Sequence, residues 1–425
     1  MKRVLMFGWE YPPEISGGLG IATHGLLAGL AKKGLKIQFV MPNAPKKAAA
    51  GQWKILSAND AKLRYEKVSQ EEYWANLSYI EIGSKLLPYI SPESFQISRT
   101  KKRTVKLETK FTDEGYEFKG GYGSNLMEEV ARFAIVAAEI SAHQDFDIIH
   151  AHDWMTFPAA LAAGEQSGKP VVLHIHSTEI ERSSPQISQG VYDLERLCLH
   201  KASHIIAVSH LTKNILQKHY EVDAMKISVV HNSFAEVFDQ PAIKKSFPSD
   251  KPTITFVGRF TKQKAPGFFI DIAKTLNDRN SDYRFVMAGD GYLLNDIKKK
   301  VHQHNLTKKF EFPGFISLKK VRSLFLKTDI FLITSSAEPF GMVALEAAHS
   351  GVPVVMTNQT GAGEVLTSAK KFNCWETFKL ANAVEALVKN PVETLKYAYK
   401  LQAEAGKRTW DKAADEVIEI YDELC

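Results

Sequence analysis

The feature that most constrains this chain is a repeated alternation of short apolar runs with helical segments. Near the N-terminus, the run Val4–Phe7 precedes a loop rich in proline and glycine, a leucine-rich helical segment that Gly34 is placed to end, and a second apolar run, Ile37–Met41. Two strands joined through a helix form a βαβ unit, and such units pair their strands in parallel. The sequence therefore predicts an α/β fold with parallel sheets.

The alternation continues in two series, which a stretch with three prolines at 236–252 separates. In the first series, further strand patterns lie at 147–150, 171–175, 205–208 and 229–230. In the second series, strand patterns lie at 253–257, 284–288, 310–312, 330–334 and 353–356. Two such series predict two doubly wound, Rossmann-like domains that face each other across a cleft. Ligands bind such sheets at the carboxyl ends of the strands.

The expected domain boundaries follow from these two series. We expect an N-terminal domain over 1–238, a C-terminal domain over 250–405 and a terminal segment over 406–425. Residues 44–125 interrupt the first series with lysine-rich turns and short alternating runs, which predict an inserted region with hairpins. The terminal segment contains an amphipathic helix that ends near Leu424.

Composition restricts the partners and the compartment. Lys and Arg number 54 against 48 Asp and Glu, a formal net charge of +6, which suits an anionic ligand such as phosphate but is too dilute to indicate nucleic acid. The three cysteines make neither a disulfide framework nor a close-spaced metal pair, which fits a reducing compartment. No apolar stretch approaches the ~20 residues of a membrane span, so we expect a cytoplasmic protein without membrane association.

The first motif is the glycine loop Ser16–Gly20, between the first strand and the first helix. Glycines let backbone N–H groups approach a phosphate, and the helix N-terminus adds partial positive charge. The same residues are equally consistent with a tight turn that binds no ligand.

The second motif is the loop Gly258–Lys264, which follows a strand and carries two cations, Arg259 and Lys264. Arginine grips phosphate oxygens with a bidentate fork, and lysine supplies a point charge. Their position at the carboxyl end of a strand favours anion binding over a solvated basic loop, whereas Lys262 is expected to face water.

The strongest local signal is the segment Glu338–Glu346, which follows a strand and enters a helix. Gly341 and Met342 lie near the helix start, where free N–H groups can hold a diphosphate. Glu338 lies on the loop, and Glu346 is embedded in an apolar helical run, where a carboxylate needs partners such as ligand hydroxyls. A helix cap and a structural ion pair are the alternatives for Glu338 and Glu346. We favour a ligand because both acids flank one helix start.

Four histidines form two pairs, His150 with His152 and His174 with His176, each at the end of a strand. Period-two spacing directs both members of a pair to one face of the sheet. The pairs are consistent with a zinc site, with recognition of sugar hydroxyls or, for His150 and His174, with hydrogen-bonded core residues. Spacing gives no reason for the two pairs to converge on one metal, so we favour sugar recognition, with His152 as the contact.

Three weaker segments complete the pattern. Phe312–Ile316 follows a strand and offers backbone amides to a nucleobase. Gly289–Gly291 is typical of a turn, and the basic run Lys101–Arg103 is typical of a solvated face.

Taken in this order, the motifs resemble the retaining GT-B glycosyltransferases, in the large family that borders on glycogen and starch synthases. The most specific elements are the two acids Glu338 and Glu346 and the loop with Arg259 and Lys264. Supporting elements are His152–Trp154, Gly17–Leu19 and Gly361–Glu364. The resemblance covers nearly the whole chain apart from 44–125.

The resemblance implies a role for each position. The implied catalytic residues are His152, Glu338, Arg259 and Lys264. The implied donor-binding residues are Gly18, Arg259, Lys264, Gly314, Phe315, Glu338, Phe340, Gly341, Met342 and Glu346. Within this set, Gly18 and the two cations would meet the donor diphosphate, Glu338 the sugar hydroxyls and Glu346 the ribose. The loop at 314–316 would face the base, and the terminal helix would pack back on the first domain.

The resemblance implies a hexosyltransferase that moves a sugar from a nucleotide-diphosphate sugar to an acceptor hydroxyl, with retention of configuration at the anomeric carbon. Glucose is the sugar we expect first, and an α-glucan is a candidate acceptor. No metal and no cofactor are expected, because Arg259, Lys264 and the helix end neutralise the diphosphate. The alternatives are a transferase for a cell-surface polysaccharide or glycolipid, a nucleotide-sugar epimerase and a non-catalytic glucan-binding protein. UDP, ADP and GDP stay open as the nucleotide.

Overall fold

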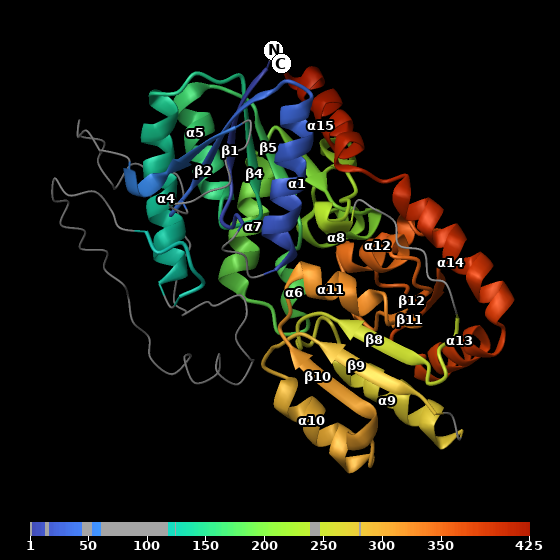
Figure 1. Cartoon of the computed structure of the whole chain (residues 1–425). Helices are drawn as coiled ribbons and strands as arrows, with labels where there is room; N and C mark the ends of the chain where they lie inside the picture. The colour runs from blue at the N-terminus through green and yellow to red at the C-terminus, as the bar shows by residue number, and fades with distance from the viewer. Residues whose placement is uncertain are drawn as a thin grey trace, which may run out of the picture. The chain divides into compact units, whose positions relative to one another are not determined.

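The computed structural model describes residues 2–12, 17–44, 53–60, 118–123, 125–238, 247–279 and 282–425. The chain divides into two compact units. Unit 1 comprises Met1–Ala207, Thr212–Val230 and Ala414–Cys425, and unit 2 comprises Val208–Leu211 and His231–Ala413. Figure 1 shows that each unit is built of strands and helices that alternate along the chain.

Unit 1 contains a sheet of seven strands in the order β3-β2-β1-β4-β5-β6-β7, with every described pairing parallel. The strands are β1 (Arg3–Phe7), β2 (Lys36–Met41), β3 (Lys54–Ser57), β4 (Ile148–His152), β5 (Val171–Ile175), β6 (His204–Ala207) and β7 (Ile227–Val229). The strand order reverses between β1 and β4. This reversal is the switch point of a doubly wound sheet, where a crevice forms at the carboxyl ends of the strands.

Helices cover the sheet of unit 1 and bury both of its faces. They are α1 (Gly18–Lys32), α4 (Leu126–Ala142), α5 (Phe157–Ser167), α6 (Glu179–Ser183), α7 (Gln189–Lys201) and α8 (His210–Tyr220). All residues of β4 and β5 are buried, as expected for central parallel strands with helices on both faces. Gly164 allows α5 to approach the sheet closely, since a Cβ there would lie 2.5 Å from Cγ2 of Val171.

Unit 2 contains a sheet of six strands in the order β10-β9-β8-β11-β12-β13, again parallel throughout its described pairings. The strands are β8 (Thr253–Val257), β9 (Arg284–Ala288), β10 (Phe310–Gly314), β11 (Ile330–Leu332), β12 (Val354–Thr357) and β13 (Lys370–Phe372). The helices are α9 (Pro266–Asp278), α10 (Leu294–Gln303), α11 (Leu318–Phe325), α12 (Met342–His349), α13 (Thr377–Lys389) and α14 (Pro391–Gly406). The order reverses between β8 and β11, so the loops after these two strands meet at the switch point of unit 2.

The last helix, α15 (Trp410–Leu424), belongs to unit 1 from Ala414 onward. Tyr421 is fully buried, and its carbonyl oxygen accepts a hydrogen bond of 2.6 Å from Nζ of Lys2. Lys33, the residue that follows α1, forms a 2.6 Å ion pair with Asp415. Figure 1 accordingly places the two chain ends side by side. The expected return of the terminal helix to the first domain is confirmed.

The α/β class and the two parallel sheets are confirmed, and two strands were not predicted. Lys54–Ser57 pairs in parallel with β2, so this part of the expected insertion extends the sheet and does not form a hairpin. The alternating run at 104–108, on which the hairpin prediction also rested, lies outside the described residues. Lys370–Phe372 was missed because it is short and contains two lysines.

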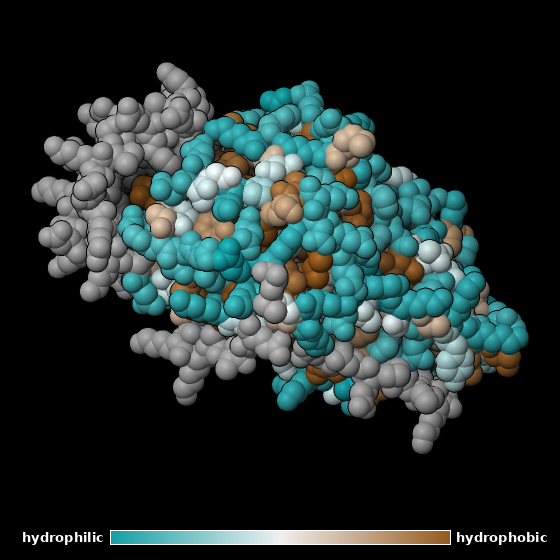
Figure 2. All heavy atoms as spheres, turned by 90° about the horizontal axis from the view of Figure 1, so that it is seen from above, coloured by the Kyte–Doolittle hydropathy of each residue, from teal (hydrophilic) through white to brown (hydrophobic). Residues whose placement is uncertain are grey.

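Apolar side chains gather mainly in one core for each unit. On the face shown in Figure 2, hydrophilic residues predominate and apolar ones occur in small groups. Among the residues that the structure describes, every helix is too short or too polar to cross a bilayer.

Candidate active site

The loops after β11 and β12 are joined to each other by backbone hydrogen bonds. The N–H of Glu338 donates to the carbonyl of Gln359 at 2.9 Å, and the N–H of Gly361 donates to the carbonyl of Glu338 at 2.9 Å. Gly361 must be glycine, because a Cβ there would lie 2.1 Å from the carbonyl oxygen of Pro339. The backbone of Glu338 is therefore held at the switch point of unit 2 by its neighbours on the next loop.

The side chain of Glu338 is the centre of a polar group at this point. It forms an ion pair with Lys264, from the loop after β8, and accepts a 2.9 Å hydrogen bond from the hydroxyl of Ser335. Only 19% of the Lys264 side chain and 7% of the Glu338 side chain are exposed. Both ions of a charge pair buried to this degree have lost most of their hydration. A ligand that offers phosphate oxygens to Lys264 and hydroxyls to Glu338 can therefore replace the contact between the two side chains.

Helix α12 begins directly beside Glu338. Its N-cap residue is Gly341, which has a φ of 91° and a conformation that favours glycine. A Cβ at Gly341 would lie 2.9 Å from Cγ of Glu338. No side chain among the described residues caps this helix, and its first turn contains no acid. The N–H groups at the start of α12 therefore suit an anion.

Glu346 lies one turn further along α12 and is buried. Burial raises the pKa of its carboxyl to about 7, and a hydrogen bond from the backbone of Ala235 opposes this shift. The described residues provide no ion pair for Glu346, so the structural ion pair considered from the sequence is not found among them. A carboxyl with this environment gains hydrogen-bond partners when hydroxyl groups approach it.

The remaining predicted residues of unit 2 differ in exposure. Arg259 is half-buried on the loop after β8, where Lys262 is exposed as expected. Gly314 ends β10 with a φ of 72°, and the Phe315 side chain that follows is 75% exposed. The ring of Phe340 is buried beside that of His231, with 5.9 Å between their centroids, so its placement is that of a packing residue.

In unit 1, the glycine loop follows β1 at the switch point of that sheet. Ser16 lies outside the described residues, and Gly17 is the N-cap of α1 with an extended backbone. A Cβ at Gly17 would meet no atom within 4 Å, and Gly18, the first residue of the helix, is exposed. The described part of the loop therefore leaves room for a ligand at the N-terminus of α1.

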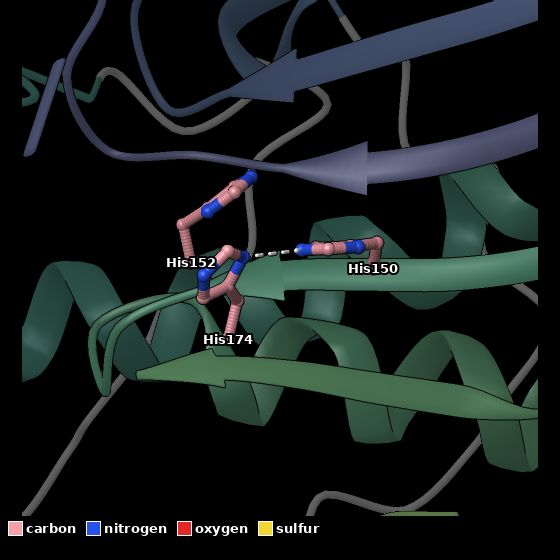
Figure 3. Close-up of side chains that lie close together, drawn as sticks. All are labelled: His150, His152 and His174. Atoms are coloured by element: carbon pink, nitrogen blue, oxygen red, sulfur yellow. Dashed lines mark hydrogen bonds between the residues drawn. The ribbon is translucent and has the colours of Figure 1, made fainter. Parts of the chain in front are cut away.

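The four histidines converge, although the spacing within each pair does not require it. In the register of β4 and β5, His152 lies directly opposite His174. One ring nitrogen from each of His150, His152 and His174 lies within 4.8 Å of the other two (Figure 3). Nε2 of His150 is 3.2 Å from Nδ1 of His174, and Nδ1 of His152 is 2.9 Å from Nε2 of His176. The pairing of β4 with β5 thus brings the two histidine pairs, which need not have converged, into one cluster.

Asp153 connects the ends of β4 and β5 just beyond this cluster. It has a φ of 59°, and its carboxylate accepts hydrogen bonds from the backbone N–H groups of His176 at 2.7 Å and Ser177 at 3.3 Å. Burial raises the pKa of the Asp153 carboxyl to about 6, although these hydrogen bonds and Arg182 act in the opposite direction. Asp153 therefore fixes the loop that carries His176.

Two family models match this chain in succession. The family described as "Glycosyltransferase Family 4" matches residues 114–234, and the family described as "Glycosyl transferases group 1" matches residues 239–408. Glycogen synthase of Mycobacterium tuberculosis is similar over nearly the full length of both proteins, with 23% identity over 432 residues that cover 99% of this chain and 94% of that one. The chain is a glycosyltransferase with the GT-B fold, in which the two family models follow one another along the sequence.

Solved structures agree with the fold of this glycosyltransferase. Sucrose-phosphate synthase from Thermosynechococcus elongatus superposes with a TM-score of 0.74 at 16% identity, covering 100% of this chain and 99% of that chain. The Anabaena protein HepE, in complex with UDP and glucose, superposes with a TM-score of 0.67 at 17% identity over the full length of both chains, 100% of each.

Within this glycosyltransferase, the structure brings three predicted residues together in unit 2 and buries a fourth, His152, in unit 1. Lys264, Glu338 and Gly341 meet at one point of unit 2, as described above. His152 is fully buried, with Nδ1 on His176 and Nε2 3.4 Å from Sδ of Met6, so both of its ring nitrogens already have neighbours. Its contact with a sugar stays a prediction, as do the ligand contacts of Gly18 and Phe315.

One polar group of the glycosyltransferase was missed by the sequence analysis. Glu364 accepts hydrogen bonds from the backbone N–H groups of His210 at 2.9 Å and Leu211 at 3.1 Å, and from Nε2 of His231 at 2.7 Å. Burial raises the pKa of this carboxyl, but its hydrogen bonds outweigh that effect and lower it. The only sequence signal was the segment Gly361–Glu364, which gives no indication of partners so distant in the chain.

Proposed function

We propose that this glycosyltransferase moves a glucosyl group from a nucleotide-diphosphate sugar to an acceptor hydroxyl, with retention of configuration at the anomeric carbon. The observation that supports the proposal best is the buried pair of Lys264 and Glu338 beside the uncapped start of α12. This arrangement offers a cation and helix amides to a diphosphate, and a carboxylate to sugar hydroxyls, within one small region.

The leaving nucleotide gains negative charge as the glycosidic bond breaks. Lys264, Arg259 and the N–H groups at Gly341 and Met342 are the groups we assign to that charge. Groups that are fixed before the reaction, and that interact more strongly with the transition state than with the ground state, accelerate the chemical step. With these groups, neutralisation of the diphosphate requires neither a divalent metal nor a cofactor.

Two carboxylates are assigned to donor hydroxyls. Glu338 would leave Lys264 and accept hydrogen bonds from the hydroxyls of the transferred sugar, while its backbone stays fixed by Gln359 and Gly361. Glu346 would accept hydrogen bonds from the ribose hydroxyls of the nucleotide, which adds partners for its buried carboxylate to the one hydrogen bond from the backbone of Ala235. Gly314 and Phe315 would lie beside the base. The buried ring of Phe340 would stabilise the loop that carries Glu338.

We assign the acceptor proton to an oxygen of the departing phosphate, on the same face of the sugar as the attacking hydroxyl. This route differs from glycoside hydrolysis, in which two carboxyl groups act from opposite sides of the glycosidic bond. It needs no general base from the protein. The contact of His152 with the donor sugar stays part of this proposal, and its 2.9 Å hydrogen bond to His176 holds its ring in one orientation.

The choice of glucose and of an α-glucan acceptor rests on relatives. Glycogen synthase is similar along the whole chain, and the Anabaena structure contains UDP and glucose. We therefore propose UDP-glucose or ADP-glucose as donor, an α-glucan as acceptor and the cytoplasm as the compartment.

The test is release of nucleotide from UDP-, ADP- and GDP-glucose, each with and without a glycogen primer and with a chelator present. We expect release from one donor that depends on the primer, and a product whose new linkage is α by proton NMR. A β linkage would contradict retention. Binding of glucan without release from any of the donors would instead indicate a non-catalytic glucan-binding protein.

A further inference from the structure

We propose that His150, His152 and His174 form a structural binding site in unit 1 for a late first-row transition-metal cation, Zn²⁺ or Cu⁺. The three rings come from the carboxyl ends of the adjacent strands β4 and β5, and Figure 3 shows them gathered around one point. Nothing in the proposed transfer reaction uses this cation, and of its three ligands only His152 is also a residue that the family resemblance assigns to the donor sugar.

The spacing of the ring nitrogens suits a metal. The three nitrogens lie within 4.8 Å of one another, and the pair formed by His150 and His174 is separated by 3.2 Å. Two nitrogens bound to one tetrahedral zinc at about 2.0–2.1 Å are about 3.3 Å apart. The nitrogens of His150 and His174 are therefore already separated as two ligands of one metal would be, and the rings would turn to direct their lone pairs at it.

The hydrogen bonds around the cluster leave the right atoms for coordination. Metal-bound histidines usually donate their second ring N–H to a fixed partner, which sets the orientation of the ring. Nδ1 of His150 is 2.6 Å from the hydroxyl of Tyr421, and Nδ1 of His152 is 2.9 Å from Nε2 of His176. A metal on Nε2 of His150 would replace the contact of that atom with Nδ1 of His174, and a metal on Nε2 of His152 would lie beside Sδ of Met6.

His174 provides the second, independent observation. Only 2% of the residue is exposed, and its Nε2 atom has no hydrogen-bond partner among the described residues. A buried imidazole nitrogen without a partner is costly, and coordination removes that cost. Coordination through Nε2 would give this atom a partner, whereas coordination through Nδ1 would replace the existing contact with His150.

The surroundings favour neutral rings and a soft metal. Burial, followed by the neighbouring histidines, holds the pKa values of His150, His152 and His174 well below the usual value, so the rings are in the uncharged form that binds metals. Sδ of Met6 lies 3.4 Å from Nε2 of His152, and a thioether together with imidazoles suits late first-row cations better than Mg²⁺ or Ca²⁺.

The experiment measures metal binding to the full-length chain after removal of metals with a chelator. Zn²⁺ and, under reducing and oxygen-free conditions, Cu⁺ are titrated in competition with a chromophoric chelator. The variants are His150→Gln and His174→Gln, neither of which touches the proposed donor site. His143→Gln is the matched control, because that histidine is 61% exposed and pairs only with Glu139 among the described residues.

We expect one equivalent of one of the two cations to bind to the wild type and to His143→Gln, and at least about tenfold weaker binding to the two cluster variants. X-ray absorption at the metal edge on the wild type should show three imidazole ligands, which keeps the test valid if a cluster variant fails to fold. Absence of stoichiometric binding of either cation, a metal shell with fewer than three imidazoles, or unchanged affinity in folded cluster variants would overturn the proposal.

Discussion

The protonation of Glu346 makes a quantitative prediction about unit 2. Burial raises the pKa of this carboxyl from an ordinary value of 4.5 to about 7. Because the pKa is raised in the folded state, the stabilisation linked to this proton is complete below about pH 4.5 and is lost as the pH rises through about 7. A shift of about 2.5 pKa units corresponds to about 3 kcal/mol.

Glu346→Gln replaces the carboxyl by a neutral amide and should remove this dependence. The free energy of unfolding of the wild type, relative to the variant, should therefore fall by about 3 kcal/mol between about pH 4.5 and pH 7. The assay is equilibrium urea unfolding at half-unit pH steps, followed by tryptophan fluorescence and circular dichroism. Glu393→Gln is the control, since Glu393 is 70% exposed on α14.

The same variant links stability to function. If Glu346 accepts ribose hydroxyls, saturating nucleotide should stabilise the wild type more than Glu346→Gln at pH 7.5, where the carboxylate is ionised. A difference in unfolding free energy that stays constant from pH 4.5 to pH 7 would refute the assigned pKa. Equal stabilisation of the two proteins by nucleotide at pH 7.5 would refute the ribose contact.

Three further predictions follow from single positions. Gly341→Ala should lower the transfer rate about tenfold or more, because a Cβ there would lie 2.9 Å from Cγ of Glu338 and a φ of 91° is unfavourable for alanine. The control Gly351→Ala, at a φ of 72° beyond the other end of α12, should leave the rate near that of the wild type, and equal losses of rate in the two variants would contradict the explanation. A hydrogen bond from Arg3 lowers the pKa of Asp147 to about 2, so the wild type should have extra stability above pH 3.8 that is lost as the pH falls through about 2, and Asp147→Asn should lack it. Acid titrations followed by circular dichroism should differ between the two proteins above pH 3.8 and agree near pH 2, and parallel curves would refute the prediction. Tyr421→Phe should lower the free energy of unfolding by about 1 kcal/mol, because Nδ1 of His150 loses its buried partner, and an unchanged thermal midpoint would contradict that assignment.

The sequence predicted the fold because the signals for it are local. Each apolar run and its following helix can be recognised within about a dozen residues, and the reversal of strand order then follows from the general behaviour of doubly wound sheets. β13 and β3 were not predicted because they lack this local signal. They are short edge strands in which lysine occupies positions that apolar residues hold in β4 and β5.

The candidate site was predicted residue by residue, but not as an assembly. The chain position of Lys264 and Glu338 gave each a role, yet their ion pair joins residues 74 positions apart and depends on which loops meet at the switch point. The histidines show the same limit. Their convergence depends on the register that places His152 opposite His174, which the spacing within each pair does not determine.

The central claim is that Lys264 and Glu338 act on a nucleotide-sugar donor. The most direct measurement compares primer-dependent nucleotide release by Lys264→Ala and Glu338→Ala with that of Lys396→Ala, which removes one member of an ion pair whose side chains are 69% and 70% exposed on α14. Circular dichroism and thermal unfolding verify the fold of each variant. We predict that both site variants lose transfer by at least about a hundredfold while Lys396→Ala keeps it. Near-normal turnover in a folded Lys264→Ala or Glu338→Ala protein would contradict the assignment of the active site.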